Sequence, residues 1–105
     1  MSEEANLLRS MAYADKEAKI TAVTVTDVPS LFTSALTSGY SRKRLSVYNY
    51  TGEVYYSFES TASVSGESLP IPENVRTEIK IKTEIPVYFF SVSGETGDLR
   101  VEELA

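Results

Sequence analysis

Residues 44–59 read Arg-Leu-Ser-Val-Tyr-Asn-Tyr-Thr-Gly-Glu-Val-Tyr-Tyr-Ser-Phe-Glu. Two runs of aromatic and β-branched residues, which suit the pleated surface of a sheet, flank a central Thr51-Gly52. Because glycine tolerates the positive φ of a tight turn, this stretch predicts a β-hairpin with Thr51-Gly52 as its loop. That loop fixes the pairing and places Tyr48 opposite Tyr55. We therefore expect a β protein in which this hairpin is the central element.

The alternation of side chains gives the predicted hairpin two unlike faces. One face is apolar and is expected to join the core; it carries Leu45, Val47, Val54, Tyr56 and Phe58. The other face is polar and rich in tyrosine; it carries Ser46, Tyr48, Tyr50, Tyr55 and Ser57. An isolated hairpin is only marginally stable in water, so a larger sheet and a second sheet packed against it are expected.

Further strand signals lie on both sides of the hairpin. Residues 20–26 predict a strand with Val23 and Val25 directed inward, and the doubly apolar residues 87–92 predict a central strand. Residues 30–36 predict an irregular or strand-like segment, and residues 93–98 a second hairpin loop. Residues 69–72 contain two prolines and are expected to form a crossover or edge segment. Residues 77–83 and 99–102 are the other expected strands. The apolar anchors of these segments are Leu69, Ile71, Ile79, Ile81 and Leu104.

The count and spacing of these segments indicate the fold class. Turn signals recur about every 8 to 15 residues, which is typical of an antiparallel sandwich or a small barrel. The expected fold is an all-β antiparallel β-sandwich, jelly-roll or Ig-like, with about six to eight strands.

The N-terminal residues 1–18 differ from the rest. Leu7, Leu8 and Met11 place an apolar stripe on a short helix, which is too short to be stable alone. We expect an N-terminal arm, helical or extended, followed by a β-sandwich domain over residues 19–105. The arm either docks on its own domain, docks on a neighbouring subunit, or stays mobile until it meets a partner.

Composition excludes several classes of function. The formal net charge of −5 argues against a nucleic-acid partner, because phosphate binding needs clustered lysine and arginine. The basic run Arg42-Lys43-Arg44 fits a solvated strand entry that discourages edge pairing. No apolar run approaches a membrane span, and the first residues lack a signal-peptide pattern, so synthesis in the cytoplasm without a membrane partner is expected.

No catalytic or metal-binding set emerges from the sequence. The chain has no cysteine and no histidine, which removes thiolate chemistry, zinc-cysteine sites and the usual general base. Glu95 and Asp98 flank glycines but lack the dense alternation of oxygen ligands seen in calcium loops. We therefore expect no enzyme activity, no cofactor and no metal.

The tyrosines of the hairpin are the remaining candidates for a site. Tyrosine combines a large apolar area with a polar tip and is enriched in contact surfaces. Tyr48, Tyr50 and Tyr55 are expected to form a protein interface, to be covered within the monomer, or to stack on sugars.

The order of segments from Arg42 onward resembles small β-sandwich proteins of tailed-bacteriophage particles, of the capsid decoration and head-tail accessory type. The resemblance covers about sixty of the 105 residues and rests on residues 44–49, 54–60, 69–72, 87–90 and 97–102.

The resemblance implies a structural virion protein, made in the host cytoplasm, that binds and stabilises a capsid shell or a head-tail connector. Its expected partners are other copies of itself and the major capsid or connector protein. The expected contact residues are Leu7, Leu8, Met11, Tyr48, Tyr50 and Tyr55. The alternative is a carbohydrate-binding or adhesion module that uses the three tyrosines.

Overall fold

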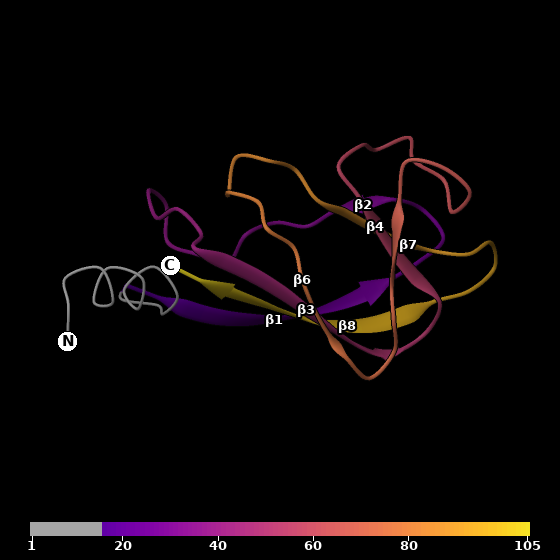
Figure 1. The fold of residues 1–105 in the computed structure, drawn as a ribbon, viewed down its shortest axis with the longest axis horizontal. Coiled ribbons are helices and arrows are strands. Elements are labelled where there is room, and N and C mark those ends of the chain that lie inside the picture. The colour runs from indigo at the N-terminus through magenta and orange to yellow at the C-terminus, as the bar shows by residue number, and fades with distance from the viewer. Residues whose placement is uncertain (1–15) are drawn as a thin grey trace, which may run out of the picture.

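The computed structural model describes residues 16–105, which form two packed antiparallel β-sheets (Figure 1). The predicted all-β sandwich is therefore confirmed. The predicted contact residues Leu7, Leu8 and Met11 lie outside the described residues. Residues 16–105 contain no helix that is long and apolar enough to span a membrane.

Each sheet has four strands. Sheet A has the order β1-β8-β3-β6, with β1 (Ala18–Val25), β8 (Gly97–Leu104), β3 (Arg44–Thr51) and β6 (Arg76–Glu78). Sheet B has the order β2-β7-β4-β5, with β2 (Ser30–Leu31), β7 (Tyr88–Ser91), β4 (Val54–Ser57) and β5 (Leu69–Ile71).

The pairing of the strands is nested. The first strand pairs with the last, β2 with β7, β3 with β6 and β4 with β5. This arrangement of eight strands in two sheets is the jelly-roll topology. Of the two sandwich types expected from the sequence, the structure thus has the jelly roll.

The predicted hairpin at residues 44–59 is wrong, because β3 belongs to sheet A and β4 to sheet B. Tyr48 lies opposite Arg100 instead of Tyr55, and Tyr55 lies opposite Phe90. The two apolar faces meet across the sandwich rather than side by side in one sheet. The alternation of residues is the same in both arrangements, so the local pattern could not distinguish them.

A corner at Gly52 replaces the predicted hairpin loop. Gly52 has the expected positive φ of 107°. A Cβ at this position would lie 2.6 Å from the carbonyl oxygen of Thr96, so only glycine lets the two crossing connections approach. Residues 93–98 were also predicted as a hairpin loop, and they likewise connect sheet B to sheet A.

The core lies between the sheets and largely follows the predicted inward faces. Its buried cluster consists of Val25, Leu45, Val47, Val54, Ile71, Ile79, Val87, Phe89, Leu99 and Val101, with Val23, Phe32, Tyr56 and Ile81 packed against it. Phe58 and Leu69 were predicted to be buried and are 44% and 57% exposed. Phe58 follows the last residue of β4, and Leu69 begins an edge strand, so neither lies over the centre of the core.

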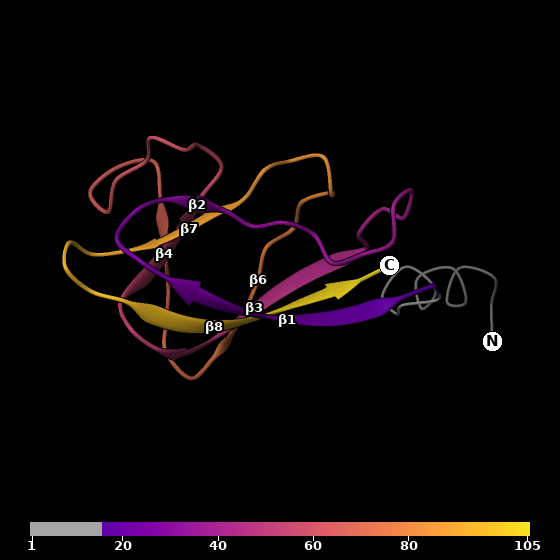
Figure 2. The ribbon, with the colours of Figure 1, turned by 180° about the vertical axis from the view of Figure 1, so that it is seen from behind.

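The two sheets differ in length. The long strands β1, β3 and β8 each have eight residues, whereas the strands of sheet B have two to four. Both views show the long strands running past sheet B toward the end that carries the C-terminus (Figure 1 and Figure 2). At this end sheet A cannot be covered by strands of sheet B, and irregular segments take their place.

Candidate binding face

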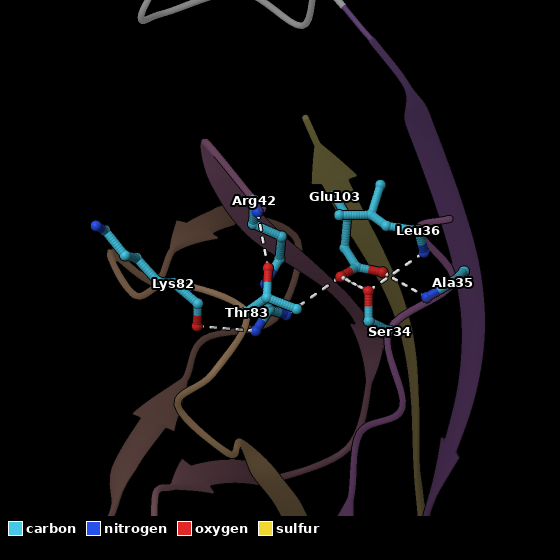
Figure 3. A network of polar contacts seen from close by, with 7 residues as sticks. All are labelled: Ser34, Ala35, Leu36, Arg42, Lys82, Thr83 and Glu103. Atoms are coloured by element: carbon cyan, nitrogen blue, oxygen red, sulfur yellow. Dashed lines mark hydrogen bonds and ion pairs between the residues drawn. The ribbon is translucent and has the colours of Figure 1, made fainter. Parts of the chain in front are cut away.

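A buried ion pair fixes the irregular segments over the overhanging end of sheet A (Figure 3). Glu103 is completely buried on the inner face of β8, in phase with Leu99 and Val101. Its Oε2 accepts hydrogen bonds from Ser34 Oγ at 2.7 Å and from Arg42 Nη1 at 3.2 Å. Its Oε1 accepts a hydrogen bond of 2.8 Å from the backbone N of residue 35.

Arg42 extends this network to a third segment. Its Nη2 donates to the carbonyl oxygen of Lys82 at 3.2 Å, and its backbone N donates to Thr83 Oγ1 at 2.8 Å (Figure 3). The side chain of Arg42 is only 3% exposed, so its prediction as part of a solvated strand entry is wrong. A substrate in solvent cannot reach this fully buried carboxylate. The network joins residues 34–35 and 82–83 to β8 and therefore has a structural role.

The leading candidate for a functional site is the outer face of sheet A, which points away from sheet B. Directly opposite residues on paired strands share a face. One row across β6, β3, β8 and β1 consists of Arg76, Tyr48, Arg100 and Ala22, and the next consists of Glu78, Ser46, Glu102 and Ile20. We call Tyr48, Tyr50, Arg76 and Arg100 the tyrosine-arginine patch.

The two tyrosines of the patch lie side by side on β3. Their ring centroids are 4.8 Å apart, with the rings tilted by 59°. The pairing of β3 with β8 shifts register between Asn49 and Thr51, so Tyr50 has no directly opposed residue in β8. Such a bulge can redirect a side chain. Tyr50 is 54% exposed, which leaves much of its ring available for contact.

The arginines of the patch are held in place by acids on the same face. Arg100 Nη1 lies 2.7 Å from Asp98 Oδ1, and its guanidinium lies 5.2 Å from the centre of the Tyr50 ring. Arg76 Nη1 lies 3.6 Å from Glu102 Oε1. These pairs are solvent-exposed, so they orient the side chains while contributing little to stability. The guanidiniums therefore remain available to a partner.

A second exposed ion pair borders the patch. Arg44 Nη2 donates to Glu78 Oε2 at 2.9 Å, and Arg44 Nε donates to Glu78 Oε1 at 3.2 Å. This hydrogen bonding lowers the pKa of the Glu78 carboxyl and raises the pKa of Arg44. Both groups are therefore charged at neutral pH.

A shallow groove of about 390 Å³ crosses this face. The four residues of the tyrosine-arginine patch make up half of its lining, and the other half consists of Ile20, Ser46, Val47 and Glu102. Ile20 is 70% exposed and gives the groove an apolar rim on β1. Aromatic, apolar and charged groups thus surround one depression on an open sheet face.

The three tyrosines predicted as contact residues do not share a face. Tyr48 and Tyr50 lie together on sheet A, whereas Tyr55 lies on β4 in sheet B. The ring of Tyr55 stacks on Phe90 with centroids 6.0 Å apart, and its hydroxyl donates to Glu53 at 2.8 Å. This hydrogen bond raises the pKa of the Tyr55 hydroxyl.

Sequence reasoning missed the arginines of the patch. Arg76 and Arg100 are distant from Tyr48 in the chain and become its neighbours only through the strand order β8-β3-β6. It also missed Glu103 and named Leu104 as the anchor. The alternation of Leu99 and Val101 was a usable signal, because it places residue 103 on the inner face.

The described part of the chain contains no group of three or more acidic residues arranged to hold a metal ion.

No protein-family model matches this chain, and no curated protein matches it. Among solved structures it is similar to protein NMB1881 from Neisseria meningitidis, with a TM-score of 0.54 and 15% sequence identity. The alignment covers 100% of this chain and 98% of that chain. At this level of identity the similarity supports the fold alone.

Proposed function

We propose that this protein is a structural virion component of the capsid decoration or head-tail accessory type and that the outer face of sheet A is its main contact surface. The observation that carries this proposal is the tyrosine-arginine patch on an open sheet face. Tyrosine and arginine are enriched among the residues that dominate the binding energy of protein interfaces.

The fold of the domain is compatible with this role. Jelly rolls occur in viral capsid domains, although they also occur in lectins, so the patch and not the fold supports the assignment. The proposed partners are other copies of this chain and a major capsid or connector protein, in a virion assembled after synthesis in the host cytoplasm. Symmetric repetition of one modest contact yields strong total binding.

The N-terminal segment is proposed as a second contact. Its apolar residues Leu7, Leu8 and Met11 precede Lys16, whose backbone N donates to the carbonyl oxygen of Ala105 at 2.9 Å. Lys16 therefore lies beside the C-terminus, at the overhanging end of sheet A. The proposed partner of the segment that precedes it is a neighbouring subunit.

The test is co-sedimentation of the purified protein with shells assembled from the major capsid protein encoded in the same genome. The variant Tyr50→Ala removes the most exposed ring of the patch, and Tyr55→Ala on sheet B is the matched control. Loss of an interface tyrosine is expected to weaken binding about tenfold or more, whereas the control should stay within about twofold. An absence of binding, or an equal loss in both variants, would overturn the proposal.

Carbohydrate binding is the second candidate. It is favoured by the neighbouring rings of Tyr48 and Tyr50 beside a groove of about 390 Å³. Glycan-array binding that disappears in Tyr50→Ala would support it. An array without a bound glycan would eliminate it.

A further inference from the structure

Strand β1 presents an open edge. It pairs with β8 along all eight of its residues, without a register shift, and no other strand of residues 16–105 pairs with it. Natural edge strands are usually short or are protected by proline, bulges or charges. In contrast, β1 has no proline and a single charged residue, Lys19, near its beginning. Within residues 16–105, its outer backbone N–H and C=O groups therefore have no partner strand.

An apolar groove lies beside this edge. It has a volume of about 310 Å³ and runs between β1 and β2, the edge strands on the same side of the two sheets. Val23, Phe32 and Phe89 line it, together with Leu31, which is 56% exposed. Because alternate side chains of a strand point to one face, a strand added to β1 would place every second side chain over this groove.

We propose that the open edge of β1 binds β1 of a second copy, antiparallel about a twofold axis, so that two copies of sheet A form one continuous eight-stranded sheet. The proposal extends the proposed self-association to a defined edge, and it does not depend on the tyrosine-arginine patch.

Self-complementarity identifies the second copy as the occupant. A twofold interface brings each residue of β1 opposite another residue of the same strand, so like charges must not meet. With the axis at Thr21 or Ala22, Lys19 lies opposite Val23 or Val25 of the other copy. The outer face of β1 carries only uncharged residues: Ala18, Ile20, Ala22 and Thr24. The two edges also have the same length, so with the axis at either residue seven of the eight residues of β1 lie opposite β1 of the other copy.

This arrangement also accounts for exposed apolar groups beside the edge. Ile20 is 70% exposed in the monomer and would lie against the outer face of the neighbouring β1. The dimer would display two tyrosine-arginine patches on one surface. A paired surface of this kind engages repeated partners more strongly than a single patch.

The chain contains no cysteine, so an introduced cysteine reports the pairing directly. Opposed residues in an antiparallel pair have Cα atoms about 4.5 to 5.5 Å apart, which suits a disulfide. Among variants with a single cysteine at one of residues 20–24, the variant with its cysteine at the twofold axis should form the covalent dimer fastest. Its rate of cross-linking should exceed that of Lys80→Cys at least about tenfold. Lys80 is exposed and lies beyond β6, the opposite edge of sheet A.

Light scattering provides the second readout. The unmodified protein is expected to have twice the 11.6 kDa monomer mass at high concentration. The variant Ala22→Glu places an acid opposite Arg100 within the monomer and two acids near each other at the axis, so it should be monomeric and folded. The control Lys80→Glu should remain dimeric.

Three results would overturn the proposal. They are a monomer at all concentrations, cross-linking no faster than at Lys80, and a dimer that Ala22→Glu leaves intact. Failure of the capsid-binding test leaves these measurements unaffected, so the two proposals are judged separately.

Discussion

Replacing Arg42 with methionine removes the positive charge from the buried network at the overhanging end of sheet A. Methionine keeps the apolar stem and roughly the volume of that stem. Glu103, which is completely buried, then retains only the hydrogen bonds from Ser34 and from the backbone N of residue 35. The variant therefore leaves a buried carboxylate without its counter-charge.

The expected loss follows from the geometry. At 3.2 Å the attraction between the two charges is about 5 kcal/mol for an effective dielectric constant of about 20. Desolvation of both groups offsets much of this attraction, so the intact pair adds little net stability. Removing one partner is different, because the other charge stays buried, and it typically costs about 3 to 5 kcal/mol. The total free energy of unfolding of a domain of this size is about 5 to 15 kcal/mol, so this loss is a large part of it.

Urea unfolding followed by circular dichroism measures this loss. With an m-value of about 1.5 kcal/mol per M, the midpoint of Arg42→Met should fall by about 2 to 3 M. The double variant Arg42→Met/Glu103→Gln removes both charges and keeps an oxygen acceptor, so it should recover at least about 2 kcal/mol. Arg44→Met, in the exposed pair with Glu78, is the control and should shift the midpoint little because water screens that pair.

The reasoning would be refuted if Arg42→Met lost less than about 1 kcal/mol, or if the losses of the single variants simply added in the double variant. Either result would mean that the charge of Arg42 does not stabilise Glu103 in the folded protein.

Two further predictions concern the corner between the sheets and the beginning of β1. Gly52→Ala should lower the melting temperature by about 10 °C or more, because the added Cβ would lie 2.6 Å from a backbone oxygen. The control Gly94→Ala, also at positive φ but with no atom within 4 Å of the added Cβ, should lower the melting temperature by about 5 to 10 °C. Equal losses in the two variants would contradict the close approach at Gly52. Glu17 accepts hydrogen bonds from the side chain and the backbone of Thr37, and these bonds lower the pKa of the Glu17 carboxyl below 4.5. The ionised carboxylate therefore stabilises the folded protein above pH 4.5, and this stabilisation is lost as the pH falls through the lowered pKa. The melting temperature of Glu17→Gln should therefore lie below that of the native protein at pH 7 and converge with it in acid, and a difference that persisted in acid would contradict this.

The inward residues of most strands could be predicted from the sequence. Val25, Val47 and Ile79 alternate with polar neighbours, and each is buried in the structure. Alternation is a local property with a period of two residues, so a short stretch is enough to reveal it. The pattern fails at strand ends, as at Phe58, because it does not mark where the backbone leaves the sheet.

The buried position of Glu103 shows a different limit. Its phase along β8 places it on the inner face, but an isolated carboxylate is unstable there. Arg42, which makes the burial stable, is 61 residues away in the chain. A charge at a core-facing position can therefore be interpreted only when its partner is known.

The amino-acid sequence was sufficient to predict a β-sandwich, the position of most strands and the faces that turn inward. The neighbours of each strand are visible only in the folded domain, where Tyr48 and Tyr50 meet Arg76 and Arg100 while Tyr55 lies on the other sheet. Strands pair through backbone hydrogen bonds, which are nearly the same for every sequence, so the residues themselves do not specify the partner. Side-chain alternation selects a face, whereas the choice of neighbour depends on how the whole chain closes around one core.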